Sequence, residues 1–242
     1  FAVLRLNLRG AGPGRPLSPG TYAAACNRDL LPALARARLL AAGLPLFGMG
    51  ISLGGTMLLN ACWGGEDGAG QPPLDGLVCA SSPLDLAACS AQIERPRNRL
   101  YQRWLLDRLC EQTLADRWGL TEAEGAILRG PERPGTIRGF DAVITAPRWG
   151  FDSVEHYYRA ASPLAVLRNG SLPLPPTLLL QALDDPWVPA ADAVGLAAEP
   201  PLGPLEVVIT ARGGHSGFHG VGDPRASCWG DRLTAAWLRR LL

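Results

Sequence analysis

The chain alternates short, continuously apolar runs with longer segments whose apolar residues recur at helical spacing. The predicted strands are residues 1–8, 44–50, 74–80, 176–182 and 205–210. The predicted helices are residues 27–42, 54–63, 100–109, 154–161 and 228–242. Buried strands that alternate with helices are typical of a mostly parallel sheet covered by helices on both faces, so the pattern predicts an α/β fold.

Residues 84–168 differ in character from the rest of the chain, because they carry most of the charged residues and many of the aromatic ones. The pattern therefore predicts one α/β domain over residues 1–242, interrupted by a helical insertion at 84–168. This insertion has two interpretations: a cap over a binding pocket that selects the substrate, or a helical surface insertion without substrate contact.

The composition limits the classes of protein to which this chain can belong. The 242 residues are 47% hydrophobic, which is enough for one sizeable core, and the net charge is +1. No block of like charge favours a nucleic-acid partner. No apolar run reaches the roughly 18 residues that a membrane span needs, so no membrane association is evident. Oligomeric state stays open.

The six cysteines form no CxxC pair, and several lie inside apolar runs. Buried free thiols are typical of a reducing compartment, and no signal peptide is visible, so a cytoplasmic location is expected.

Candidate chemistry begins at Ser52, in a G-x-S-x-G motif formed by Gly50, Ser52 and Gly54. The motif follows a predicted strand and precedes a predicted helix, the context in which a serine on a sharp turn acts as a nucleophile. The small residues on either side are expected to relieve backbone crowding, and the Leu53 N–H can donate to an oxyanion. By itself the motif is weak evidence for a nucleophile, because a glycine-rich turn that only allows close packing would have the same sequence pattern.

A serine hydroxyl needs a base, and the sequence offers three histidines. His156 falls within a predicted helix and reads as an ordinary polar position. His215 lies between glycines just after the last predicted strand, which favours it as the base, and His219 is the alternative.

Asp184 and Asp185 follow the strand predicted at 176–182, where a carboxylate could orient the histidine. The alternative is an aspartate-rich turn. Their position at the carboxyl end of a strand favours function, and the order serine, aspartate, histidine is that of the α/β hydrolases.

Several further segments resemble the YheT-like α/β hydrolases, the esterase and lipase branch that includes the plant embryogenesis-associated proteins. They extend over nearly the whole chain and comprise residues 7–12, 52–55, 140–141, 145–147, 150–151, 157–158, 184–186, 213–215 and 217–218.

The resemblance implies an α/β-hydrolase fold that cleaves carboxylic esters, such as acylglycerols or other lipid or short-chain esters, by a Ser-His-Asp acyl-enzyme mechanism. It assigns the acid of the triad to Asp185, beside Ser52 and His215. It implies a small-molecule ester substrate, no metal and no organic cofactor.

The sequence departs from the family at its start. Family members carry a His-Gly loop after an earlier strand, which supplies a second oxyanion donor, and no such loop precedes Asn7. The N-terminal strands are therefore expected to be missing, and the sequence is interpreted as part of a longer enzyme.

Two rival functions stay open at this stage. An acyltransferase or thioesterase would use the same triad, and a non-catalytic binding protein could share the fold.

Overall fold

The computed structural model describes residues 1–63, 72–170, 173–201, 203–224 and 227–242. Its sheet has four parallel strands in the order β1-β2-β3-β4. They are β1 (Phe47–Ile51), β2 (Gly76–Ala80), β3 (Thr177–Ala182) and β4 (Leu205–Thr210). The four strands predicted within residues 44–50, 74–80, 176–182 and 205–210 are thus confirmed.

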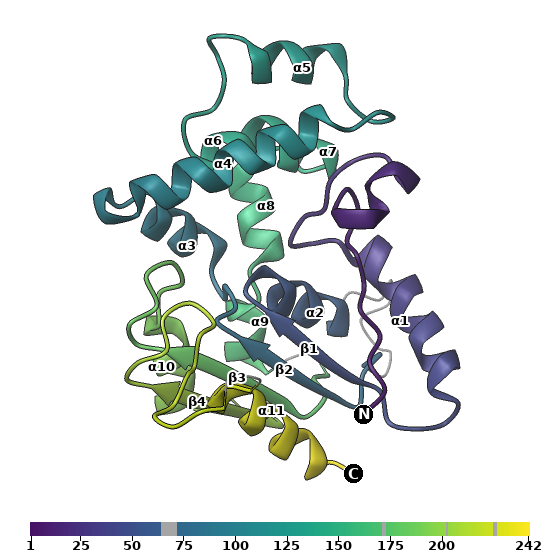
Figure 1. Ribbon diagram of the computed structural model, residues 1–242, viewed down its shortest axis with the longest axis vertical. Helices are drawn as coiled ribbons and strands as arrows, with labels where there is room; N and C mark the ends of the chain where they lie inside the picture. The colour runs from purple at the N-terminus through teal and green to yellow at the C-terminus, as the bar shows by residue number, and fades with distance from the viewer. Residues whose placement is uncertain (64–71, 171–172, 202, 225–226) are drawn as a thin grey trace.

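Helices make up most of the remaining regular structure (Figure 1). The longer ones are α1 (Asn27–Ala41), α2 (Leu53–Trp63), α3 (Leu86–Ile93), α4 (Arg99–Leu114), α5 (Glu122–Arg129), α8 (Val154–Ala161), α9 (Leu164–Asn169), α10 (Ala191–Ala198) and α11 (Trp229–Arg239). Short turns of helix complete the set: η1 (Gly12–Leu17), η2 (Pro96–Asn98), α6 (Ile137–Phe140), η3 (Asp141–Thr145) and α7 (Ala146–Arg148). Each of the five predicted helices is present, whereas α3, α5, α9 and α10 were not predicted individually.

The strand predicted at residues 1–8 is wrong. These residues carry no strand assignment and are drawn as coil beside the sheet (Figure 1). The side chains of Val3 and Leu4 are 88% and 62% exposed. A strand is stabilised by ladder hydrogen bonds and by burial of one face. Among the described residues no strand pairs with this segment. Leu8 packs against the cluster around Leu30 and Met57, and the Phe1 ring meets that of Phe47, but most of its apolar side chains stay exposed.

Alternate residues of the central strands face two separate apolar clusters. Leu77 and Cys79 of β2 pack with Leu59 of α2 and with α9 and α10 on one side. Val78 of β2 and Leu178 of β3 pack with α11 on the other. This period of two gives the parallel sheet a helical layer on each face, as the sequence predicts.

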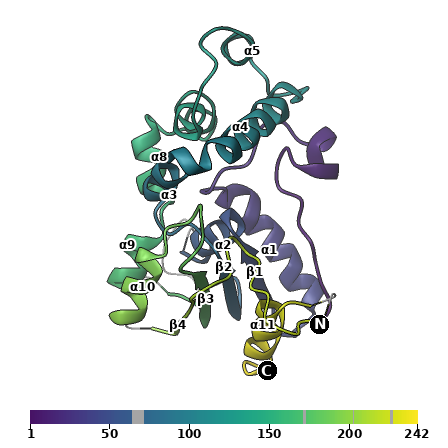
Figure 2. The same cartoon turned by 60° about the vertical axis from the view of Figure 1, so that its left-hand side comes forward.

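Helices α3 to α8 stand beyond the carboxyl ends of the strands in both views (Figures 1 and 2). They have a small apolar core of their own, which includes Leu106, Leu128, Phe140 and Ile144. The next helix, α9, returns to the sheet, because Leu164 and Leu167 pack in the same cluster as β2.

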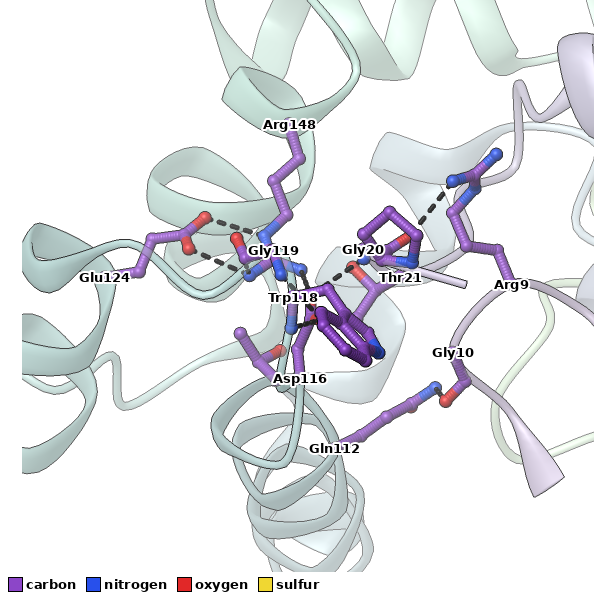
Figure 3. A network of polar contacts seen from close by, with 12 residues as sticks. Arg9, Gly10, Gly20, Thr21, Gln112, Asp116, Trp118, Gly119, Glu124 and Arg148 are labelled. Carbon is purple, nitrogen blue, oxygen red and sulfur yellow. Dashed lines mark hydrogen bonds and ion pairs between the residues drawn. The ribbon is translucent and has the colours of Figure 1, made fainter. Parts of the chain in front are cut away.

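A buried polar network joins the helical segment to residues 9–21 (Figure 3). The side chains of Arg148 and Asp116 are 9% and 1% exposed, and Arg148 also forms a two-bonded pair with Glu124 at 2.6 and 2.8 Å. Asp116 accepts hydrogen bonds from the backbone N–H groups of Gly20 and Gly119 at 2.8 and 2.9 Å. Two bonded carboxylates thus compensate the buried guanidinium, and the network fixes how the two segments dock.

Candidate active site

The turn between β1 and α2 carries Ser52 in a left-handed backbone conformation, with φ of 53°. Left-handed geometry is uncommon for residues other than glycine and is concentrated at functional sites. A hydrogen bond from the Ser52 N–H to Ala80 O of β2, at 2.8 Å, attaches this turn to the sheet. Ser52 therefore projects from the carboxyl edge of the sheet on a sharp turn between strand and helix.

Close packing around α2 explains why residues 50 and 55 are glycines. Gly50 belongs to the predicted motif, and Gly55 does not. A Cβ on Gly50 would lie 2.4 Å from the backbone of Gly55, and one on Gly55 would lie 2.0 Å from Ser82 Oγ. A Cβ on Gly54 would meet nothing within 4 Å outside its own helix. The crowding expected around Ser52 thus falls on Gly50 and Gly55, and Gly54 of the motif is sterically free.

Three side chains from separate segments converge here. His215 Nε2 lies 2.9 Å from Ser52 Oγ, and His215 Nδ1 lies 3.0 Å from Asp185 Oδ2. The segment with Asp185 follows β3, and the segment with His215 follows β4. Parallel strands end at one edge of the sheet, which is why residues 163 positions apart meet there.

Asp185 is buried and well supplied with donors. Its Oδ1 accepts from the backbone N–H groups of Trp187 and Val188, at 2.9 and 3.0 Å. Burial alone would raise the pKa of this carboxyl, but the hydrogen bonds from His215, Val188 and Trp187 outweigh it and lower the pKa. The ionised Asp185 therefore accepts from His215 Nδ1, leaving Nε2 free to take a proton from Ser52.

The other histidines lie apart from these contacts. His156 is on α8, where its Nδ1 is 3.2 Å from Asp152, and His219 is exposed.

Leu53 is the first residue of α2, so its N–H lies in the first helical turn, where amides have no partner within the helix.

Aromatic residues that sequence reasoning missed lie beside His215. The Trp187 ring is 4.6 Å from that of His215, and Tyr101 of α4 stacks on Trp187 at 3.6 Å with an interplanar angle of 9°. Gln92 and Asn98 donate to Pro186 O, at 3.2 and 2.8 Å. Nothing in the local sequence marks these contacts, because the partners are far apart in the chain, and those from α4 and the segment before it lie more than 80 residues from Pro186 and Trp187.

All six cysteines are free thiols, and five of them are buried. Among the helices of the described ranges, none combines the length and apolar character needed to cross a bilayer.

Several known proteins are similar to this chain in sequence. Mouse (Mus musculus) phospholipase ABHD3 is 30% identical over 243 residues, covering 100% of this chain and 57% of that protein. Escherichia coli (strain K12) YheT is 34% identical over 201 residues, covering 82% and 56%. Saccharomyces cerevisiae medium-chain fatty acid ethyl ester synthase/esterase 2 is 27% identical over 212 residues, covering 78% and 45%. The chain thus spans about half the length of the curated relatives it matches.

The resemblance to the YheT-like hydrolases is confirmed by these relatives, and the α/β architecture by the parallel sheet between helical layers. A family model described as the alpha/beta hydrolase family matches residues 1–240, nearly the whole chain. The chain belongs to the alpha/beta hydrolase family.

Proposed function

We propose that this chain carries the reacting groups of a serine hydrolase that cleaves carboxylic esters through an acyl-enzyme. The observation that supports the proposal most is the pair of contacts from His215, 2.9 Å to Ser52 Oγ and 3.0 Å to Asp185 Oδ2. Both distances are within hydrogen-bond reach, which a nucleophile, a base and an orienting carboxylate require.

The reaction has two half-steps. Ser52 Oγ attacks the ester carbonyl while His215 Nε2 takes its proton, and the Leu53 N–H donates to the oxyanion that forms. His215 then protonates the departing alcohol as the C–O bond breaks. Water attacks the acyl-enzyme by the same route, which releases the acid and returns the proton to Ser52. Asp185 holds the imidazole orientation and stabilises its cationic form in both half-steps.

The segment 84–168 acts as a cap in this proposal. Support comes from Gln92 and Asn98, which bond to Pro186 O next to Asp185, and from Tyr101, whose ring stacks on Trp187 beside His215. The aromatic rings give the site an apolar side, which suits an ester with a hydrocarbon chain. A lipid ester is the substrate class that this surface favours, and the mouse relative is itself named a phospholipase.

Ester hydrolysis by the purified chain tests the proposal. A p-nitrophenyl ester series of rising acyl length would be offered to wild type, Ser52→Ala and Ser18→Ala. The last is the matched control, because the Ser18 hydroxyl is exposed and donates to the O of its neighbour Pro19. We expect Ser52→Ala to lose turnover by about 10⁶-fold and Ser18→Ala to keep it. Wild-type turnover in Ser52→Ala would overturn the assignment.

Acyl transfer is the second candidate, because the yeast relative is named an ethyl ester synthase as well as an esterase. The same acyl-enzyme would then be attacked by an alcohol or a thiol in place of water. Product analysis with added ethanol separates the two: an ethyl ester that outweighs the free acid favours transfer. A fluorophosphonate probe separates both from a non-catalytic binding protein, in which Ser52 would stay unlabelled.

A further inference from the structure

The backbone that carries His215 has an unusual conformation. Ser216 and Phe218 have φ values of 70° and 43°, and Gly214 has φ of 56°. Left-handed residues other than glycine persist only where the surroundings hold them in place. Something besides local preference must therefore hold the turn that presents His215.

Two side chains outside the Ser52–His215–Asp185 set bond to this turn, one on each side of the histidine. On the N-terminal side, Asp184 Oδ1 accepts from the N–H groups of both Gly213 and Gly214, at 2.9 and 2.8 Å. On the C-terminal side, Ser81 Oγ accepts from the Ser216 N–H at 3.2 Å.

The residues that make these contacts with the turn are themselves attached to the sheet. Ser81 directly follows β2 and is fully buried, and its own N–H bonds to Leu180 O of β3 at 2.8 Å. Asp184 lies two residues after β3. The Phe218 ring is buried against Ala182 and Leu180, which ties the far end of the turn to the sheet. Residues that follow β2 and β3 thus fix the turn that follows β4.

We propose that Asp184 and Ser81 are positioning residues, which hold the backbone on both sides of His215 so that Nε2 stays within reach of Ser52 Oγ. The adjacent aspartates then have separate tasks: Asp185 orients the imidazole ring, and Asp184 orients the peptide groups that precede it. Asp184 acts through two N–H groups, so what it must supply is an acceptor oxygen. This inference rests on the proposed ester hydrolysis.

Asp184 offers the sharper test, because its contacts lie at the surface and its removal leaves the core intact. Asp184→Ala removes the acceptor, whereas Asp184→Asn keeps Oδ1 and removes only the charge. Asp75→Ala is the matched control, since Asp75 is also exposed and also accepts from a backbone N–H, that of Leu46 at 2.6 Å, but lies at the amino ends of β1 and β2. Ser81→Ala tests the other side of the turn.

We expect Asp184→Ala to lower kcat for a p-nitrophenyl ester by about 10- to 100-fold, because small displacements of reacting groups are costly. The KM should stay within about twofold, since substrate binding is not touched. Asp184→Asn should recover most of the rate, Ser81→Ala should lower kcat in the same direction, and Asp75→Ala should match wild type. A kcat for Asp184→Ala equal to that of Asp75→Ala would overturn the proposal, and so would an equal loss in Asp184→Asn.

The NMR signal of the His215 Nδ1 proton gives a second readout that needs no turnover. The bond to Asp185 protects this proton from exchange in wild type, and we expect the signal to weaken in Asp184→Ala and to return in Asp184→Asn. An unchanged signal in Asp184→Ala would contradict the positioning role. If wild type hydrolyses no ester and Ser52 takes no fluorophosphonate, the proposed function fails, while this signal still decides whether Asp184 positions His215.

Discussion

Replacing Arg148 by methionine tests whether the buried network in Figure 3 holds the helical segment to the N-terminal segment. The change keeps much of the side-chain volume and removes the cation. Glu124 loses both its short bonds, and Asp116 loses one at 3.1 Å.

The expected loss in the free energy of unfolding depends on the hydrogen bonds that Asp116 and Glu124 keep in the variant. Breaking a buried ion pair by removing one partner costs about 3–5 kcal/mol. Asp116 keeps its backbone donors, among them Gly20 and Gly119, and Glu124 keeps the Thr121 N–H. The loss should therefore lie near the lower end, about 3 kcal/mol in the free energy of unfolding at pH 7. For a domain of this size that corresponds to a fall in Tm of about 6–12 °C.

The same change has a definite pH dependence. Burial would raise the pKa of Asp116 and Glu124, but N–H donors and Arg148 lower both pKa values below their ordinary range. A carboxyl with a lowered pKa in the folded state adds stability above its unfolded pKa and loses it as the pH falls. Without the cation both pKa values are less depressed. The gap between wild type and Arg148→Met should thus be widest near pH 7 and should narrow below about pH 4.

Urea unfolding followed by circular dichroism, at pH 7 and at decreasing pH, measures this gap. Arg108→Met is the control, because Arg108 and Glu111 form an exposed pair at 57% and 58% exposure, and such pairs contribute about 0–1 kcal/mol. A loss in Arg148→Met no larger than that in Arg108→Met would refute the reasoning, as would a gap that does not change with pH.

Two further predictions concern stability. Gly55→Ala should destabilise the fold by about 1–3 kcal/mol through overpacking against Ser82. Gly54→Ala, where a Cβ has open space, should be neutral or gain up to about 1 kcal/mol from helix propensity; equal urea midpoints for the two variants would contradict the steric argument. Burial raises the pKa of Asp141 to about 6, although the Tyr158 and Thr145 hydrogen bonds lower it. A pKa raised in the folded state means that stability is lost as the pH rises through about 6, so wild type should lose about 2 kcal/mol between pH 4.5 and 7.5 relative to Asp141→Asn. Parallel stability curves for wild type and Asp141→Asn would rule this out.

The sequence by itself determined the elements with strong local signals. Continuous apolar runs identified all four strands of the sheet. The reason is clearest for β2 and β3, which are buried along their whole length and need apolar residues throughout, whereas β1 and β4 are partly exposed. It also brought Ser52, Asp185 and His215 forward as candidates, since each follows a predicted strand and parallel strands end at a common edge. The same reasoning failed at residues 1–8, where an apolar pattern cannot show whether a partner strand lies alongside.

Only the tertiary structure decided which groups surround the site. Whether Gly54 or Gly55 is crowded depends on how closely α2 approaches β1 and Ser82, a packing distance that no motif encodes. The stack of Tyr101 on Trp187 joins segments far apart in the chain. Asp184 and Asp185 are identical in type and adjacent in sequence, yet one bonds to the backbone before His215 and the other to its ring. That difference arises because the turn after β3 directs the two carboxylates at different parts of one loop, which is a property of the folded chain.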